Sequence, residues 1–461
     1  MDIKNKRVTV IGLGNSGLNA ALLAREKGAE VFVTDSANTP ELKKAKLELE
    51  SKGIEVEIGE HTECFVKGSD LVVVSPGVEN SSAAVKWALK EKIPIISEME
   101  LGYAFCRGRI IAITGTNGKS TVTTLIGEIL RAGDKRVVVC GNIGNSLCGE
   151  VSKIKDDTWV VLEVSSAQLE RIERFRPHIA VILNITDDHR DRYRTFYEYF
   201  NYKLRIFSNQ QADDILVLNY DAENLRRLKG LTRSRVVFYG KQKVAGNTYN
   251  ISAYVKDEWV CCRLNGKERE IVPVVAIKLK GVHNLENVLA CSLVGALVGV
   301  EDGPMREAIK NFKGLEHRFE TVDTINGVEY INDSKGTTVD SAKRALESCE
   351  KPVILIAGGK DKHSDYSVAR DVIKKKAAHV VLMGEAAPMI KKALKNTVEI
   401  HEADDMYDAV ETAHKLAKEG WIVLLSPMCS SFDMFKNYEE RGRVFKDAVK
   451  RLKNSLHGVK T

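Results

Sequence analysis

The sequence contains no apolar stretch close to the roughly 18 residues that a membrane-spanning helix needs. It lacks any Cys-x-x-Cys pair, and its nine cysteines follow no regular spacing, so we expect reduced, buried, apolar cysteines and neither a disulfide framework nor a zinc site. No signal-peptide pattern follows Met1. Charge of one sign is not in excess, because 69 Lys and Arg against 63 Asp and Glu leave only +6. That balance is no argument for nucleic-acid binding.

These absences exclude a membrane protein, a secreted mini-protein and a disordered scaffold. With 44% hydrophobic and 29% charged residues, the composition is typical of globular proteins, and 461 residues are enough for about three domains. Alternating strand and helix patterns restart near residues 97 and 314, with no low-complexity linker. We predict an α/β protein of three domains: a Rossmann-like domain over 1–97, a P-loop ATPase-like domain with a mainly parallel sheet over 98–313, and a second Rossmann-like domain over 314–461.

The strands read as continuous apolar runs separated by helices, which is typical of parallel sheets buried on both faces. Residues from about 245 to 280 differ, because two short runs there suggest antiparallel strands with a turn at Asn265–Gly266. A long apolar helix is predicted from about 287 to 300. The predicted strands are 7–11, 31–35, 71–74, 94–96, 110–113, 137–139, 159–162, 179–183, 215–218, 249–252, 259–262, 353–356, 380–383 and 421–425.

A first glycine loop, Gly12-x-Gly14-x-x-Gly17, follows a predicted strand and opens a predicted helix. This is the context of a dinucleotide-binding fingerprint, in which the helix N-terminus binds a diphosphate. Asp35 ends the next strand, near the spacing of a ribose-binding acid. Taken alone, the loop indicates NAD; a tight turn without a ligand and a site for another nucleoside diphosphate remain alternatives.

A second loop runs from Gly115 to Thr121 between another strand and helix. Ile113 stands where the full Walker pattern has glycine, but the Gly-Lys-Ser core is intact. Backbone N–H groups of this loop are suited to bind phosphates. Lys119 would reach the outer phosphates, and Ser120 would bind a Mg²⁺ ion. Two nucleotide-type loops in two domains argue against a simple dehydrogenase.

The second loop resembles the ATP loop of the Mur ligases, the cytoplasmic amide ligases of peptidoglycan synthesis, and further motifs follow in the order of that family. They span all three predicted domains. They are 141–144, 162–170, 184–189, 191–193, 203–206, 281–287, 316–318, 332–335, 358–360, 425–433 and 435–438.

Three of these stretches, 163–169, 333–335 and 426–435, are similar to the branch of the family that adds D-glutamate. The resemblance implies that ATP activates the carboxylate of UDP-N-acetylmuramoyl-L-alanine as an acyl phosphate, which the D-glutamate amine attacks, releasing ADP and phosphate. It implies a cytoplasmic monomer with small-molecule partners, no nucleic acid and no membrane span. Gly336, Thr338 and Tyr438 depart from the usual Ala, Asn and Phe.

Two alternatives remain. One is another ligase of the same superfamily with a different acceptor amino acid, such as a folylpolyglutamate synthetase; the first glycine loop disfavours it, since those enzymes lack a UDP-binding first domain. The other is a non-catalytic nucleotide-binding regulator. An ATPase assay with and without substrate would distinguish such a regulator from a ligase.

Two anions must meet in such a reaction, so Mg²⁺ and lysines are expected between them. Glu163 follows a strand at its carboxyl end and offers a hard oxygen ligand. The resemblance implies that His189 ligates a second ion and that Lys203 is carbamylated to bridge the ions. Without the resemblance, Lys203 reads as a solvated helix lysine beside Arg205.

The resemblance implies the following site residues. The catalytic set is Lys119, Glu163, His189, Lys203 and Lys335, and the metal ligands are Ser120, Glu163, His189 and Lys203. ATP contacts are Gly115, Thr116, Asn117, Gly118, Lys119, Ser120, Thr121, Asn284, Asn287, Arg318 and Asp333, with helix capping as the alternative for the two helical asparagines. Contacts to the UDP substrate are Gly14, Asn15, Ser16, Gly17, Asp35, Ser36, Ser75, Pro76, Gly77, Asn142 and His189. Acceptor contacts are Thr337, Lys360, Ser431, Phe432 and Tyr438.

Overall fold

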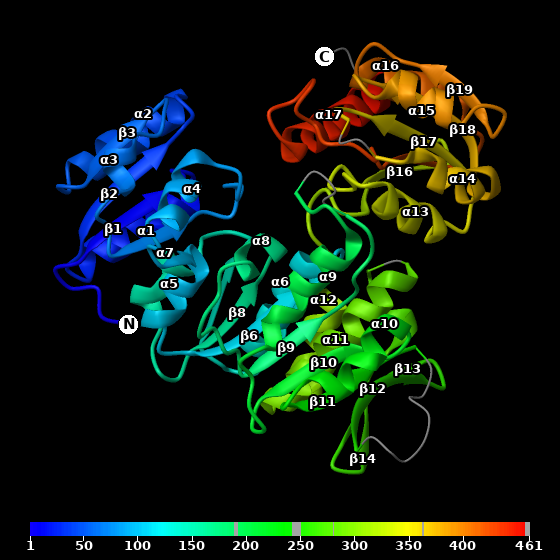
Figure 1. The fold of residues 1–461 in the computed structure, drawn as a ribbon. Coiled ribbons are helices and arrows are strands. Elements are labelled where there is room, and N and C mark those ends of the chain that lie inside the picture. Colours follow the sequence, from blue (N-terminus) through cyan, green and yellow to red (C-terminus); the bar gives the residue numbers. More distant parts are fainter. Residues whose placement is uncertain (189–191, 242–249, 280, 362–363, 457–461) are drawn as a thin grey trace. The chain divides into compact units, whose positions relative to one another are not determined.

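The computed structural model describes residues 1–188, 192–241, 250–279, 281–361 and 364–456. The chain forms two compact units: residues 1–185, 195–274 and 286–310 make up the first, and residues 186–194, 275–285 and 311–461 the second. Two sheets lie in the first unit and one in the second (Figure 1). The predicted three-domain α/β architecture is confirmed, while the boundaries near 97 and 314 stay a prediction.

The first sheet is entirely parallel, in the order β3-β2-β1-β4-β5. Its strands alternate with helices, as the sequence pattern predicts. The strands are β1 (Arg7–Ile11), β2 (Glu30–Asp35), β3 (Glu55–Ile58), β4 (Leu71–Val74) and β5 (Ile95–Ser97), and the helices are α1 (Asn15–Glu26), α2 (Pro40–Glu50), α3 (Glu63–Val66), α4 (Ala83–Lys90) and α5 (Glu98–Phe105).

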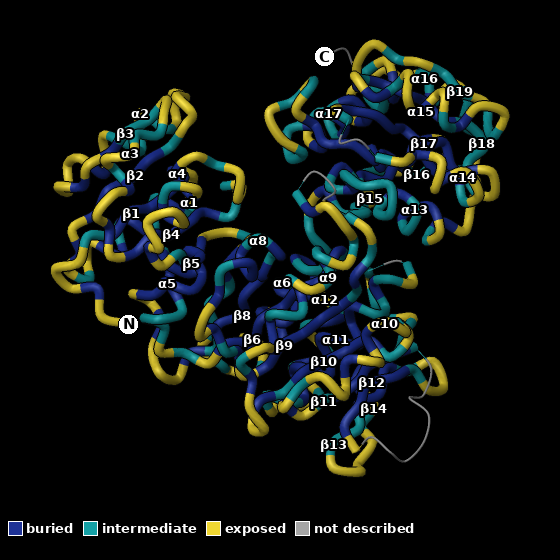
Figure 2. The backbone as a smooth tube through the Cα atoms, in the orientation of Figure 1, coloured by how far each residue is buried: buried dark blue, intermediate teal, exposed yellow. Residues whose placement is uncertain are grey.

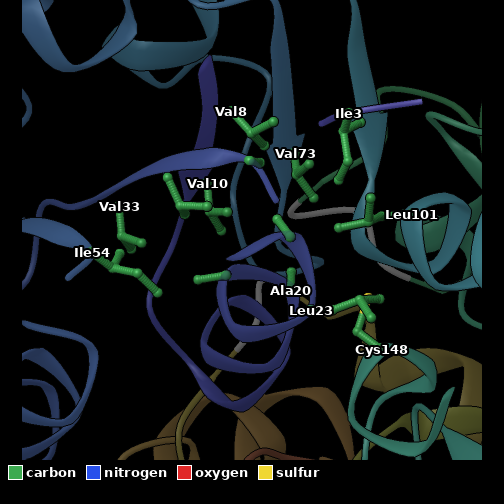
Figure 3. Packing of buried hydrophobic residues seen from close by; sticks show 14 of the residues in the cluster. Ile3, Val8, Val10, Ala20, Leu23, Val33, Ile54, Val73, Leu101 and Cys148 are labelled. Atoms are coloured by element: carbon green, nitrogen blue, oxygen red, sulfur yellow. The ribbon is translucent and has the colours of Figure 1, made fainter. Parts of the chain in front are cut away.

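Helices cover both faces of this sheet because its strands are apolar on both sides. Val8, Val10 and Val73 pack with Ala20 and Leu23 of α1 on one face (Figure 3). The opposite face packs against α3 and α4. Such two-sided burial stabilises a parallel sheet and leaves its carboxyl edge as the place for loops that bind ligands.

The second sheet has the order β14-β13-β12-β11-β10-β9-β6-β8-β7, parallel from β7 through β12 and antiparallel from there to β14. Its strands are β6 (Arg109–Thr114), β7 (Val137–Gly141), β8 (Trp159–Glu163), β9 (Ile179–Ile182), β10 (Ile215–Asn219), β11 (Arg235–Tyr239), β12 (Ile251–Lys256), β13 (Trp259–Leu264) and β14 (Lys267–Pro273). The helices in this part of the chain are α6 (Lys119–Ala132), α7 (Leu147–Glu150), η1 (Val151–Lys153), α8 (Ser166–Leu169), α9 (Phe196–Leu204), η2 (Arg205–Phe207), α10 (Glu223–Arg226), η3 (Arg227–Leu231), η4 (Val274–Ala276), α11 (Val282–Val298) and α12 (Asp302–Asn311).

The antiparallel end of the second sheet confirms the predicted change of character. Asn265 and Gly266, with φ of 50° and 80°, form the turn between β13 and β14. Residue 249, the first of the predicted strand 249–252, lies outside the described residues.

The third sheet lies in the second unit, in the order β15-β16-β20-β17-β18-β19, and only β15 is antiparallel to its neighbour. Its strands are β15 (Glu320–Ile325), β16 (Val328–Asn332), β17 (Val353–Gly358), β18 (Ala377–Met383), β19 (Glu399–Glu402) and β20 (Ile422–Leu425). Its helices are α13 (Val339–Glu347), η5 (Tyr366–Ala369), α14 (Arg370–Lys376), α15 (Ala387–Ala393), α16 (Met406–Leu416) and α17 (Tyr438–Leu456).

The core of the second unit follows the two-residue period of its strands. Val353, Leu355 and Ala357 of β17 pack with α13, α14 and α15, whereas Ile354 and Ile356 pack with α16 and α17. The central strands of all three sheets are accordingly buried (Figure 2). Among the described residues, no helix combines the length and the apolar character needed to cross a bilayer.

Candidate functional site

The first glycine loop lies where the strand order of the first sheet reverses, between β1 and β4. Gly12 has a φ of 91°, and a Cβ atom on Gly17 would lie 1.8 Å from the Gly12 carbonyl oxygen. Ser75, at the end of β4, donates from Oγ to that same oxygen over 2.8 Å. Glycine is therefore required for the close approach of helix and strand. Of the residues predicted for the UDP substrate, those of the first domain lie directly after β1, β2 and β4 at one edge of this sheet, whereas Asn142 follows β7 of the second sheet.

The Asp35 carboxylate is held by backbone groups of this edge. Its Oδ2 accepts from the Leu13 N–H over 2.7 Å, and its Oδ1 accepts from the Ala37 N–H over 2.8 Å. Asp35 thus connects the glycine loop to the end of β2. Of the predicted contacts, Gly14, Asn15, Ser36 and Gly77 are exposed, Asp35, Ser16 and Pro76 are half-buried, and Gly17 and Ser75 are buried.

The second loop follows β6, which lies between β8 and β9 at the reversal of the second sheet. Gly118 has a φ of 85° just before α6, and a Cβ atom there would lie 2.6 Å from Asn287 Oδ1. Asn184 holds the loop: its carbonyl accepts from the Thr116 N–H over 2.9 Å, and its side chain exchanges hydrogen bonds of 2.9 and 3.0 Å with the Asn117 backbone. Sequence reasoning assigned Asn184 to a motif but no role to its side chain.

The Lys119 ammonium folds over the second loop. Its Nζ donates to the carbonyl oxygens of Gly115 and Thr116 over 2.9 and 2.8 Å. Ser120 and Thr121, in the first turn of α6, are buried. A cation, the N-terminal turn of a helix and a small hydroxyl thus meet in one loop, which is the arrangement that binds nucleotide phosphates.

Glu163 lies at the end of β8, beside β6, in register with Ile113. The side chain is only 2% exposed. Asn142 donates from Nδ2 to Glu163 Oε1 over 2.9 Å, while Oε2 has no hydrogen-bond partner among the residues that the structure describes. A buried carboxylate oxygen without a partner is costly, and a bound cation would compensate it.

Lys203, in α9, is buried against the second loop. Its Nζ donates to the Gly115 carbonyl over 3.0 Å and lies 3.5 Å from Thr114 Oγ1 and 4.8 Å from the ring centroid of Tyr199. With the side chain 2% exposed, the interpretation as a solvated helix lysine is wrong. Its neighbour Arg205 instead binds backbone carbonyls of the segment after α8.

Two other predictions need comment. His189 lies outside the described residues. Asn284 and Asn287 are buried inside α11, which begins at Val282, so neither is an N-cap residue and the capping alternative is wrong.

In the second unit, the loop after β16 is organised around Asp333. Its Oδ1 accepts from the Phe319 N–H over 3.2 Å and its Oδ2 from Ser426 Oγ over 2.8 Å. Withdrawal of the carboxyl group from solvent raises its pKa to about 7, against the smaller opposing effects of Ser426, the Phe319 amide and the Arg318 guanidinium. A Cβ atom on Gly336 would lie 2.4 Å from Asp333 Oδ2. Glycine, in place of the usual alanine, therefore leaves room for this carboxylate.

The remaining acceptor candidates follow the ends of β16, β17 and β20. Lys360 is exposed, and its backbone N–H donates to the Ser430 carbonyl over 2.9 Å. Lys335 Nζ lies 3.8 Å from the ring centroid of Tyr438. Thr338, the second departure, caps α13 by accepting from the Ser341 N–H over 3.1 Å.

Of the other acceptor candidates, Ser431 is buried, Thr337 is half-buried and the Phe432 side chain is largely exposed.

Arg441, which sequence reasoning missed, joins two of these loops. Its guanidinium donates to Ser334 Oγ and O over 3.1 and 2.8 Å, to the Ser430 carbonyl over 3.1 Å and to the Cys429 carbonyl over 3.2 Å. Burial lowers its pKa to about 10, which leaves it charged at neutral pH. Its spacing of four residues from Phe445 places it on the buried face of α17, a signal that the sequence does carry.

The cysteines are all free: seven are buried as expected, but Cys64 is exposed and Cys106 is half-buried.

Comparisons with known proteins match nearly the whole chain. Residues 6–97 match the Mur ligase MurD-like N-terminal domain, residues 113–295 the Mur ligase middle domain, and residues 317–429 the glutamate ligase domain of Mur ligases. The UDP-N-acetylmuramoylalanine–D-glutamate ligase of Koribacter versatilis is 44% identical over 98% of this chain and 99% of its own. Its namesake from Geotalea daltonii is 43% identical, with the same coverage of both chains.

Solved structures share the fold. A pseudomurein peptide ligase type C from Methanothermus fervidus has a TM-score of 0.62 at 19% identity, covering 97% of this chain and 100% of its own. The ligase MurF from Thermotoga maritima, solved in complex with ADP, has a TM-score of 0.61 at 14% identity and covers 98% of this chain and 100% of its own.

Proposed function

This chain belongs to the Mur ligase family, and from that premise we propose that it joins D-glutamate to UDP-N-acetylmuramoyl-L-alanine at the expense of ATP. The observation that carries the proposal is the 41–44% identity to ligases named for this reaction, over 98% of the chain. A folylpolyglutamate synthetase is disfavoured because residues 6–97 match a Mur ligase N-terminal domain. A regulator without catalysis is disfavoured by the buried lysine and carboxylate beside the phosphate loop.

The nucleotide is proposed to bind with its phosphates on the Gly115–Thr121 loop. Lys119 holds two loop carbonyls and exchanges them for phosphate oxygens when ATP is present. Its charge then stabilises the negative charge that develops as the terminal phosphoryl group moves to the substrate carboxylate. The acyl phosphate is a better electrophile than the carboxylate, so the amine attacks it through a tetrahedral intermediate and phosphate leaves.

Mg²⁺ fits the residues beside this loop. Glu163 Oε2, buried without a partner among the described residues, and the hydroxyl of Ser120 are hard oxygen donors that would hold one ion. We propose two ions, with Lys203 as its carbamate and His189 as the further ligands. An ammonium repels a cation, whereas a carbamate supplies oxygens. When bound, the ions would neutralise charge between ATP and carboxylate. Asn142 orients Glu163 for this role.

The first domain is proposed to hold the UDP end of the substrate. Its glycine loop presents the N-terminus of α1, where Gly14 has no side chain to cap the helix. Helix N–H groups and the positive end of the dipole then face a diphosphate. The domain boundaries that we propose remain 1–97, 98–313 and 314–461.

D-Glutamate is proposed to bind in the third domain through its two carboxylates. Lys360 supplies charge, and Lys335, Thr337 and Ser431 supply further donors; Arg318 and Asp333 are assigned to ATP. Charge-assisted hydrogen bonds would fix the amine toward the acyl carbon. An acceptor without the side-chain carboxylate leaves these donors unpaired and is therefore rejected.

The test is mass-resolved product formation by the full chain from ATP, UDP-N-acetylmuramoyl-L-alanine and either D- or L-glutamate. We expect product with the D-isomer only, and a loss of about 10²–10³-fold in rate for Lys119→Ala. The matched control is Lys155→Ala. Lys155 is exposed and lies before the start of β8, at the edge of the sheet opposite the Gly115–Thr121 loop. Equal use of both isomers would contradict the acceptor assignment, and ATP turnover without a joined product would favour a regulator. We also propose that the chain acts as a cytoplasmic monomer. Size-exclusion chromatography with light scattering measures its molar mass and so tests whether it is a monomer.

A further inference from the structure

Two histidines and a glutamate gather at the outer strands of the third sheet, in the second unit. His379 lies in β18, and Glu399 and His401 lie in the edge strand β19. The register pairs His379 with Glu399, and His401 follows two residues later, so all three side chains stand on one face. They lie near the start of β18, whereas the predicted acceptor loops follow the opposite ends of the strands.

The distances between the three side chains are those of a metal-ligand set. His379 Nδ1 lies 3.4 Å from Glu399 Oε2 and 3.4 Å from His401 Nε2, and His401 Nε2 lies 3.6 Å from Glu399 Oε1. A tetrahedral zinc ion with ligand bonds of about 2.0–2.1 Å separates its ligand atoms by about 3.3–3.4 Å. Three protein ligands with one position left over also match the open type of zinc site.

The surroundings favour an ion over a simple ion-pair cluster. The His379 and His401 side chains are 19% and 25% exposed, while Glu399, at 66%, faces solvent and leaves an approach for an ion. The Trp421 ring lies next to His379, with ring centroids 6.3 Å apart. Among the described residues, no Lys or Arg forms an ion pair with Glu399.

A second cluster, Glu316, His317 and Glu320, shows the contrast. Lys446 already pairs with Glu316 over 2.7 Å and with Glu320 over 2.8 Å, and His317 Nδ1 lies 2.9 Å from the amide of Asn332. A lysine therefore stands where a cation would bind. The cluster at β18 and β19 has no such occupant among the described residues.

We propose that His379, Glu399 and His401 form a binding site for a divalent transition-metal ion of the zinc type, separate from the catalytic ions. Imidazole nitrogen and a single carboxylate are donors that zinc accepts and Mg²⁺ does not favour. Bound there, the ion links the edge strand β19 to β18 through side chains, in addition to their backbone hydrogen bonds.

To test this, the full chain is titrated with Zn²⁺ and binding is followed by calorimetry. Excess Mg²⁺ is present throughout, so that sites with oxygen ligands are already saturated. The double variant His379→Gln/His401→Gln should bind the tightest Zn²⁺ equivalent at least about 10–100-fold more weakly, since even outer contacts of a metal site cost that much. Glu402→Gln is the matched control, because Glu402 lies on the same strand, next to His401, but pairs with Lys391. It should bind as the unchanged chain does.

Three further readouts separate the outcomes. Co²⁺ should give the strong visible absorption of a four-coordinate ion in the unchanged chain and lose it in the double variant. Thermal unfolding without metal checks that the double variant is folded, and its ligase activity should be unchanged. Equal Zn²⁺ affinity in all three proteins, or an equal loss in Glu402→Gln, would overturn the site and leave the cluster as an ion pair.

Discussion

At the scale of the residue, two charged groups beside the Gly115–Thr121 loop are almost fully buried. Lys203 is 2% exposed and Glu163 is 2% exposed, both at the carboxyl edge of the second sheet. Burying a charge costs free energy unless partners compensate it. Such groups are therefore more informative about ligands than exposed ones of the same type.

The first residue-scale prediction concerns Lys203. Lys203→Ala should lower the turnover number by at least about 10–100-fold, as loss of a metal contact does. Acetate or another short carboxylate should restore part of the activity by supplying oxygen ligands in place of the carbamate. Steady-state rates with and without the acid measure this, and Lys155→Ala should show no response to it. A fully active Lys203→Ala variant would sink the carbamate proposal.

The second concerns pH and Asp333. Because its pKa is raised to about 7, the native state keeps a proton between roughly pH 4 and pH 7 that the unfolded state has lost. This contribution stabilises the fold in acid and is lost as the pH rises toward 7. The free energy of unfolding of the unchanged chain minus that of Asp333→Asn should therefore fall from pH 4 to pH 7 and level off above. Denaturant titrations at four or five pH values measure it; a difference that rises with pH would refute the assignment.

The third concerns Gly336. A methyl group there would meet Asp333 Oδ2 at 2.4 Å and Ser426 Oγ at 2.6 Å, so the hydrogen bond between them must shift. Gly336→Ala should destabilise the chain by about 1–3 kcal/mol. Gly230→Ala, where an added Cβ meets nothing within 4 Å, serves as the control. The urea midpoints of unfolding of both variants measure this loss of stability. Two indistinguishable midpoints would contradict the prediction and mean that the loop around Gly336 adjusts without cost.

At the scale of the element, helix α17 acts on loops far from it in sequence. Arg441 in its first turn binds the loop after β16 and the loop after β20. These loops carry Lys335 and Ser431, which we assign to the reacting groups. A helix placed for packing thus also sets the distance between two parts of the acceptor region.

Replacement of Arg441 tests this positioning role. Arg441→Lys keeps the charge but cannot reproduce four directed hydrogen bonds, so it should lower the free energy of unfolding by about 1–3 kcal/mol. The KM for D-glutamate should rise more than the KM for ATP. Arg443→Lys, exposed on the same helix, should change neither constant. A proportional change of both KM values in Arg441→Lys would indicate a structural role only.

At the scale of the whole molecule, the two glycine loops are built on one plan for different ligands. Each follows a parallel strand at a reversal of strand order, where loops separate and leave a crevice. The fold therefore supports the proposal that both loops bind phosphates, but it does not distinguish UDP from NAD in the first. The family supplies that distinction.

Calorimetry on the full chain tests the nucleotide of the first domain. A UDP-sugar should bind with measurable heat in the presence of an ATP analogue that occupies the second loop. NAD at the same concentration should give no heat of binding, because the resemblance assigns the loop to a uridine diphosphate. Tight binding of NAD together with none of the UDP-sugar would reverse the interpretation of the Gly12–Gly17 loop.

The sequence alone determined most of the strands that are apolar on both faces, since their pattern is local. Arg7–Ile11, Leu71–Val74 and Ile422–Leu425 lie within or close to their predicted ranges. Among the strands that the structure describes, it missed six. Four of them, β3 (Glu55–Ile58), β14 (Lys267–Pro273), β15 (Glu320–Ile325) and β19 (Glu399–Glu402), are edge strands in which charged residues interrupt the apolar ones, so that pairing stabilises them more than composition does. The other two, β11 (Arg235–Tyr239) and β16 (Val328–Asn332), lie inside their sheets. The positions of the two glycine loops, each between a strand and a helix, were also predictable, because glycine spacing depends on neighbours in the chain.

Only the tertiary structure decided the environment of single side chains. Lys203 is buried by a strand that ends some 90 residues before it, and Arg441 binds groups about 10 and 107 residues away. His379 and His401 meet because two strands pair in one register, and a shift of one residue would place them on opposite faces. Local pattern predicts which elements form; burial, charge compensation and the meeting of distant side chains depend on how those elements pack.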